Sequence, residues 1–235
     1  MFSVNLRSLV SGIHVAAGLL LAFAGLVIPA EAQESGTHPN YPAASPEHGG
    51  IVFTGSSIFQ FWTHLKDQMA PLPVLNRAIA GTVTQDMLNR MGQLVLPYQP
   101  RIVVYYCGSN DISAGEDAAP IVERTKRFIQ ILHEKSPNTY FFYTSIQKAP
   151  EKRARWEVVE AVNREMERYS REVANVGYID LNSVLFDGAN VRQNLLLPDG
   201  LHFRPDSTAY MEFSQIVKPV LARAWDRGAG LPKSN

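Results

Sequence analysis

The chain has 235 residues, of which 46% are hydrophobic and 19% are charged, which is the composition of a globular protein and excludes a disordered or fibrous one. Lysine plus arginine and aspartate plus glutamate each total 22, so the formal net charge is zero. Because there is no basic excess to hold a phosphate backbone or an anionic membrane surface, we expect no nucleic-acid partner.

The first 32 residues are predicted to be a secretory signal peptide. Arg7 lies in a short polar start, residues 15–28 are almost wholly apolar, and Ala30-Glu31-Ala32 has the small-x-small pattern of a cleavage site. We therefore expect an exported protein, periplasmic or secreted, that starts near Gln33 and has no stable membrane insertion after cleavage. An uncleaved anchor is the alternative, because an apolar stretch of about 15 residues is short for a span but not impossible.

The rest of the chain is expected to form one domain. Residues 33–50 are rich in Pro, Ser, Gly, Asn and His without a hydrophobic period, which predicts a linker or an N-terminal arm. Residues 51–228 are the predicted domain and residues 229–235 a tail. Cys107 is the single cysteine, so no internal disulfide can form, and its place at the end of an apolar run predicts burial. We expect no metal and no cofactor.

Short apolar runs in this domain alternate with longer stretches of helical period. Several of the runs lack polar alternation, as strands buried on both faces of a parallel sheet do. The expected strands are Ile51–Thr54, Val74–Ala78, Ile102–Cys107, Tyr140–Thr144 and Tyr178–Leu181. This alternation predicts an α/β fold, a three-layer α/β/α sandwich with right-handed crossovers. Since ligands of such sheets bind beyond the carboxyl ends of the strands, polar residues there are the candidates for a site.

Helical periods fill the intervals between the expected strands. One helix is expected from Ile58 to about Gln68, and apolar stripes with charged opposite faces run along residues 122–132 and 156–173. A last helix is expected from Ser207 to Trp225. Pro219 should kink that helix or divide it in two.

Ser57 follows the first expected strand through Gly55 and begins the next helix. Free backbone N–H groups and the helix dipole at this N-terminus would favour developing negative charge. A serine here can attack a carbonyl carbon and donate its own N–H to the resulting oxyanion. The alternative is a helix N-cap, a position that serine often occupies.

Two further donors follow the second and third expected strands. Asn110 ends the third strand, where its side-chain NH₂ can hold charge in a tetrahedral intermediate. The alternative is that residues 108–111 form only a strand-terminating turn, in which Asp111 is a cap or brace. Gly81 can bring a bare backbone N–H close to a ligand.

Asp199 and His202 stand three residues apart in a loop flanked by prolines. The carboxylate can accept from one ring nitrogen and leave the other free to take a serine proton. A surface turn with a solvated histidine is the alternative. Because the other candidates follow the first three strands and this loop precedes the last helix, all of them can meet at one edge of the sheet.

Four short segments carry these candidates: one has Ser57, one Gly81, one Asn110 and one the Asp199–His202 pair. In these segments and their order the chain resembles the SGNH hydrolases, also called GDSL-type esterases or lipases, over nearly all of the expected domain. The resemblance implies a flavodoxin-like, five-stranded parallel sheet of order 2-1-3-4-5. It implies a catalytic triad of Ser57, His202 and Asp199. The oxyanion hole would consist of the N–H groups of Ser57 and Gly81 and the side chain of Asn110.

One position departs from the family pattern, because Ser56 stands where an Asp usually precedes the nucleophile. The Gly-Ser-Ser opening followed by Trp62, and the pair Asn76-Arg77, are similar to one branch of the family. The change affects local pKa and substrate preference more than mechanism. Arg77 and Trp62 are candidates for substrate contact; a salt bridge supporting the cleft is the alternative for Arg77, and a core position for Trp62.

Together these observations predict an exported serine hydrolase that cleaves carboxylic esters through an acyl-enzyme. Short acyl or acetyl groups are favoured, because no insertion resembles a lid. The expected partner is a small-molecule or glycan ester. An acyltransferase acting on envelope glycans and a non-catalytic glycan-binding module on the same scaffold are the alternatives.

Overall fold

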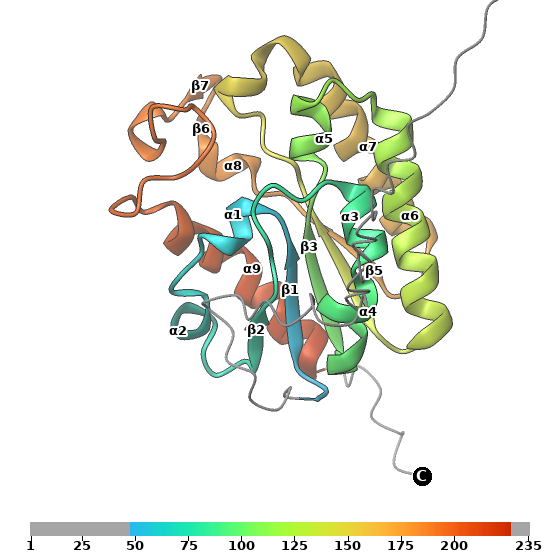
Figure 1. Cartoon of the computed structure of the whole chain (residues 1–235). Coiled ribbons are helices and arrows are strands. Elements are labelled where there is room, and N and C mark those ends of the chain that lie inside the picture. The colour runs from blue at the N-terminus through green and yellow to red at the C-terminus, as the bar shows by residue number, and fades with distance from the viewer. Residues whose placement is uncertain (1–47, 227–235) are drawn as a thin grey trace, which may run out of the picture. The chain divides into compact units, whose positions relative to one another are not determined.

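The computed structural model describes residues 48–226 (Figure 1). The predicted signal peptide, residues 33–47 of the predicted linker and the predicted tail lie outside this range, so export stays a prediction. Within the described range, no helix has the length and apolar character that a membrane crossing requires.

A five-stranded parallel sheet forms the centre of the described domain. Its strands are β1 (Ile51–Gly55), β2 (Val74–Asn76), β3 (Ile102–Tyr106), β4 (Tyr140–Thr144) and β5 (Val176–Ile179). They lie in the order β2-β1-β3-β4-β5, and each neighbouring pair is parallel. The predicted fold class and strand order are therefore confirmed.

Four strands differ from the expected boundaries: β1 ends one residue later and β3 one residue earlier, and β2 and β5 differ by two residues at an end because local hydrogen bonds compete with the ladder. β2 ends at Asn76, whose Oδ1 accepts from the N–H of Ala78 at 3.1 Å in a local turn. β5 begins after Asn175, which has a left-handed φ of 59°, two residues earlier than expected. It ends before Asp180, whose carboxylate accepts from the hydroxyl of Ser145 at 2.9 Å.

Helices cover both faces of the sheet, as Figure 1 shows. Side chains that alternate along each strand enter two separate apolar cores, one under each helical layer. The first layer comprises α1 (Ser57–Gln60), α2 (Leu65–Met69), α8 (Asn182–Leu185) and α9 (Ala209–Asp226). The second comprises α3 (Thr84–Asn89), α4 (Met91–Leu94), α6 (Ala118–Lys135) and α7 (Trp156–Glu172).

The remaining elements are one short helix, a pair of two-residue strands and three 3₁₀ segments. Helix α5 (Ser109–Ser113) follows β3, and the strands β6 (Phe186–Asp187) and β7 (Asn190–Val191) pair antiparallel. The 3₁₀ segments are η1 (Leu96–Tyr98), η2 (Pro150–Arg155) and η3 (Gln193–Leu195).

The helix expected from Ile58 to Gln68 is instead two short helices. α1 ends at Gln60 and α2 begins at Leu65, with Trp62 in the turn between them. The Trp62 ring is 1% exposed and stacks on Tyr210 at 5.6 Å. We attribute the break to burial of this large ring, which outweighs local helical preference.

The other expected helices are present with small shifts in their ends. The stripes predicted along residues 122–132 and 156–173 lie within α6 and α7, although Val173 follows the last helical residue. α9 continues through Pro219, so of the two predicted effects the division into two helices does not occur, and the kink stays a prediction. A proline removes one hydrogen bond from the helix, and here the buried face of α9 on both sides of it holds the helix together.

Cys107 is buried, as expected, just after β3. Its Sγ lies 3.5 Å from the carbonyl oxygen of Thr82. Burial, followed by the nearby charge of Asp111, raises the pKa of this thiol well above its ordinary value.

The close approach of β1 to β3 depends on Gly55. This residue has a φ of +130°, and a Cβ atom on it would lie 1.9 Å from the carbonyl oxygen of Tyr106. The same oxygen accepts from the N–H of Ser56 at 2.9 Å. The residue two before Ser57 therefore has to be glycine.

Replacement of Gly55 by alanine is expected to lower the free energy of unfolding by about 2 kcal/mol or more, because backbone overlap and an unfavourable φ add. Guanidinium unfolding followed by circular dichroism measures this. Gly92→Ala in α4 is the control, since a Cβ there meets nothing within 4 Å. Alanine should leave that helix unchanged or stabilise it by about 0.5–1 kcal/mol. Equal stabilities of the two variants would contradict the argument.

Candidate active site

Ser57 and His202 are in hydrogen-bond contact although 145 residues separate them. Nε2 of His202 lies 2.8 Å from Oγ of Ser57, and Nδ1 lies 2.7 Å from Oδ2 of Asp199. In this arrangement the hydroxyl can donate to Nε2 while Nδ1–H donates to the carboxylate. The structure thus brings the three predicted triad residues together, and their catalytic roles stay predictions.

Ser57 is the first residue of α1, directly beyond the carboxyl end of β1. The N-cap of α1 is Ser56, so Ser57 does not occupy the cap position that was the alternative for it. The N–H of Ser57 lies in the first turn, where a helix offers it no acceptor. Because α1 has only four residues, free N–H groups rather than a helix dipole would stabilise an anion here.

The loop that carries Asp199 and His202 is anchored on both sides. Leu197 N–H donates to the carbonyl oxygen of His202 at 2.8 Å, and Phe203 is buried in the first core. Oδ1 of Asp199 accepts from the N–H groups of Leu201 at 2.9 Å and His202 at 3.0 Å. Both oxygens of the carboxylate are therefore engaged, which holds the imidazole in one orientation.

The pKa of Asp199 lies below its ordinary value. Partial burial raises this pKa, but the hydrogen bond with the His202 ring and those from the N–H groups of Leu201 and His202 lower it further. The carboxylate is therefore charged at neutral pH and can accept from the imidazole.

Thr82 connects the end of β1 to the segments that carry Gly81 and Asn110, the other two predicted oxyanion donors. Its hydroxyl lies 2.9 Å from the carbonyl oxygen of Gly55, and its own carbonyl oxygen accepts from Nδ2 of Asn110 at 2.9 Å. Gly81, next to Thr82, is exposed and has a φ of +79°. These contacts place the three segments side by side at the carboxyl edge of the sheet.

Asn110 lies in the first turn of α5 and not at the end of β3 as expected. Its amide has two N–H donors, and the bond to Thr82 needs only one of them. Asp111 faces away from this edge: its buried carboxylate accepts from the N–H of Thr84 at 3.0 Å and from Arg124 at 3.1 Å. Asp111 therefore braces α5 against α3 and α6.

The two predicted substrate contacts differ in their placement. Trp62 is enclosed in the first core, so the core position weighed for it is confirmed and the substrate contact is wrong. Arg77 follows β2, and its guanidinium carbon lies 5.3 Å from the centre of the Tyr98 ring, a cation–π contact. A substrate contact of Arg77 stays a prediction.

Phe61, which the sequence reasoning missed, lies beside His202. Its side chain is 46% exposed, and the centres of the two rings are 5.3 Å apart. One signal was available, because Phe61 stands four residues after Ser57 and residues four apart share one face of a helix.

Lys152 is also missed by sequence reasoning, because nothing in the sequence marks a lysine as buried. Its side chain is 1% exposed, and Nζ lies 2.5 Å from Oε2 of Glu151 and 2.8 Å from Oγ of Ser113 in α5. The N–H of Glu151 donates to the carbonyl oxygen of Gly200 at 3.2 Å. A buried cation therefore links the helix of Asn110 to the Asp199–His202 loop.

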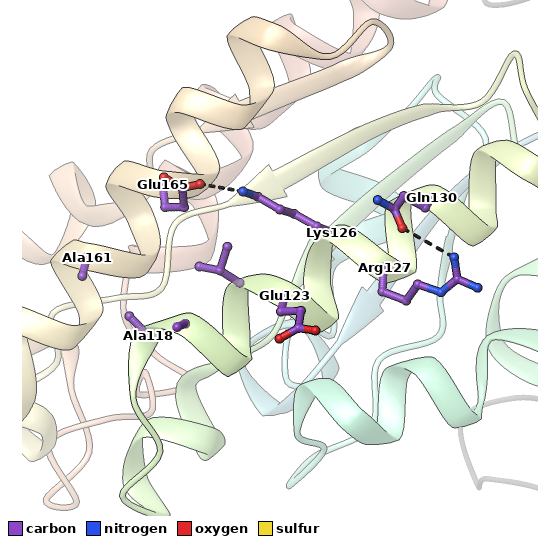
Figure 2. Close-up of a pocket in the computed structure, with 9 residues that line it drawn as sticks. Ala118, Glu123, Lys126, Arg127, Gln130, Ala161 and Glu165 are labelled. Atoms are coloured by element: carbon purple, nitrogen blue, oxygen red, sulfur yellow. Dashed lines mark hydrogen bonds and ion pairs between the residues drawn. The ribbon is translucent and has the colours of Figure 1, made fainter.

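A separate groove of about 690 Å³ lies between α6 and α7 (Figure 2). Lys126 of α6 reaches toward Glu165 of α7, with Nζ 2.5 Å from Oε1. Among the described residues that line this groove there is no serine, histidine or cysteine. The groove holds none of the predicted site residues and is distinct from the edge that carries Ser57.

Comparison with known proteins places the fold among hydrolases. The profile of the GDSL-like lipase/acylhydrolase family matches residues 49–207. A Streptococcus pneumoniae protein provisionally described as a platelet activating factor has a TM-score of 0.67 at 20% identity, over 76% of this chain and 86% of its own. A GDSL-like lipase from Bacteroides thetaiotaomicron has a TM-score of 0.61 at 20% identity, over 74% and 88%.

A carbohydrate esterase of family 3 from Talaromyces cellulolyticus has a TM-score of 0.62 at 17% identity, over 76% of this chain and 99% of its own. At these identities the likeness shows the fold. No curated protein matches the chain.

The variant Asp199→Asn is expected to be less stable than the parent at pH 7, and this difference should shrink at pH 3. The reason is that the pKa of Asp199 is lower in the folded than in the unfolded chain. The contribution of the charged carboxylate to the free energy of unfolding is thus present above its pKa in the unfolded chain, about 3.9. This contribution is lost as the pH falls through its pKa in the folded chain. Urea unfolding at both pH values measures the effect. A difference that persists unchanged at pH 3 would show that the charge of this carboxylate is not the cause.

Proposed function

The chain belongs to the GDSL-like lipase/acylhydrolase family, and from this premise we propose that it is a serine hydrolase that cleaves carboxylic esters with Ser57 as nucleophile. The observation that carries the proposal is the 2.8 Å contact between Nε2 of His202 and Oγ of Ser57. The contact of Nδ1 with Asp199 at 2.7 Å supports it, because a base that is oriented by a carboxylate is what an activated serine requires.

Acylation would begin with transfer of the Ser57 hydroxyl proton to Nε2 of His202. Oγ bonds to the ester carbonyl carbon, and the carbonyl oxygen takes the negative charge of the tetrahedral intermediate. The charged carboxylate of Asp199 stabilises the imidazolium. The intermediate collapses as the bond to the alcohol oxygen breaks and His202 returns the proton to that oxygen, leaving an acyl-enzyme.

Deacylation would repeat these steps with water in place of the alcohol. His202 takes a proton from the water as its oxygen attacks the acyl carbon, and then protonates Oγ of Ser57 as the acid leaves. In both steps the oxyanion would be held by the N–H groups of Ser57 and Gly81 and by Nδ2 of Asn110. Fixed donors stabilise such a charge without reorganising at the moment of reaction.

Short acyl groups, acetyl above all, are the proposed acids. This choice rests on the sequence, in which no insertion resembles a lid that would enclose a long acyl chain. An acetyl group needs little more than the space between Oγ and the oxyanion donors. The esterase named among the structural neighbours supports an ester of a sugar as one class of substrate.

The variant Ser57→Ala should lose hydrolysis of p-nitrophenyl acetate and labelling by a fluorophosphonate probe, because both need the Ser57 oxygen. Ser56→Ala is the matched control, since its buried hydroxyl has no hydrogen-bond partner within the described chain. The control should keep both signals. Labelling that survives in Ser57→Ala would overturn the assignment, and a parent that takes no label would favour a non-catalytic module.

The variant Asn110→Ala should lower kcat for the same ester by roughly 10²–10³-fold, because it removes one donor to the oxyanion. Asn89→Ala on the exposed surface of α3 is the control and should keep the kcat of the parent. Circular dichroism checks that both variants are folded. A kcat of Asn110→Ala within about twofold of the parent would remove Asn110 from the oxyanion hole.

A further inference from the structure

Phe61 directly follows α1, the short helix that carries the nucleophile. Its side chain is exposed to solvent beside His202, the proposed general base. The N–H of Phe61 donates to the carbonyl oxygen of Ser57 at 2.9 Å. The adjacent aromatic residues Phe59 and Trp62 are both buried in the first core, whereas Phe61 is 46% exposed. The backbone of Phe61 is therefore held next to Ser57, and its ring presents an exposed apolar surface there.

The end of α1 is also fixed on its other side. The side chain of Gln60 accepts from the N–H of Ala80, next to Gly81. Together with the contact of the Phe61 ring on His202, this holds the residue pair 60–61 between the two halves of the site. An exposed single apolar side chain is common and means little alone; its rigid contact with the proposed base is the informative observation.

The chemistry of the proposed reaction decides which part of an ester Phe61 would meet. His202 must protonate the oxygen of the leaving alcohol, so the alcohol lies on the imidazole side of the tetrahedral carbon. The oxyanion lies on the side of Gly81 and Asn110. In Figure 1 the loop that follows β7 and helix α5 flank α1 on opposite sides. Phe61, in contact with His202, therefore belongs to the alcohol side.

We propose that Phe61 is a specificity-determining residue that binds the alcohol part of the ester by contact with its ring, and that this alcohol is a pyranose sugar. The inference rests on the proposed function and deepens it. One face of a pyranose presents C–H bonds, which are attracted to the negative face of an aromatic ring. Its hydroxyl groups need polar partners, and the Asp199 side chain, which contacts the same His202 ring, is 46% exposed. A single ring beside an exposed carboxylate matches a sugar better than an alkyl chain.

This placement separates the two halves of the reaction. The alcohol departs when the acyl-enzyme forms, so contact with Phe61 acts on binding and acylation, and it is absent when water resolves the acyl-enzyme. Removing the ring should therefore affect kcat/KM for esters of ring alcohols and leave the deacylation rate unchanged.

The experiment compares an acetylated methyl xylopyranoside with methyl acetate, two esters that yield the same acetyl-enzyme. Phe61→Ala should lower kcat/KM about 5- to 20-fold for the sugar ester and less than about twofold for methyl acetate. Phe61→Trp, which keeps an aromatic face, should retain the preference. Met211→Ala is the control, because Met211 is an equally exposed apolar residue, at 50%, on α9.

Equal losses on both esters, or none on either, would overturn the role of Phe61 while leaving the proposed function intact. Fluorophosphonate labelling, which needs no sugar, should still occur in Phe61→Ala and be lost in Ser57→Ala, which shows whether Ser57 is still active. A parent that neither takes the probe nor hydrolyses either ester would overturn the proposed function, and this inference with it.

Discussion

The hydrogen bond between Ser57 and His202 is the interaction on which the arrangement of the site depends, and it is long-range in sequence. It requires that the chain turn into α1 at once when β1 ends, which Gly55 permits by its positive φ and missing side chain. It also requires the loop near the C-terminus to return to the same edge, where Phe203 anchors it in the core. Because β1 lies inside the sheet, between β2 and β3, segments from both sides of it can meet at its carboxyl end.

Around this contact, buried polar groups that take no part in the proposed chemistry connect the surrounding segments by hydrogen bonds. Thr82 joins the ends of β1 and α5, Asp111 joins α5 to the second helical layer, and Lys152 joins α5 to the Asp199 loop. All three are buried, so each of these bonds is made where water does not compete for it. The candidate donors and the candidate base are thus carried by segments that cannot move independently of one another.

Much of this fold could be predicted from the sequence, because uninterrupted apolar runs mark strands that are covered on both faces. The strand order came from a family resemblance and could not follow from periodicity. The ends of β2 and β5 were misplaced because local hydrogen bonds of Asn76 and Asp180 decide them. The exposure of Phe61 could not be predicted, because it follows from the break between Gln60 and Leu65, and a regular helical period cannot anticipate a break.

The chain places a thiol close to the edge of the sheet that carries the hydroxyl. Cys107 lies against Thr82, yet it is enclosed and its pKa is raised, so the thiolate that alkylating agents and oxidants attack is scarcely formed. Because Cys107 is the single cysteine of the sequence, no internal disulfide can form whatever the redox state of the surroundings. Reagents that alkylate the nucleophile of cysteine hydrolases should therefore react only slowly with the folded protein.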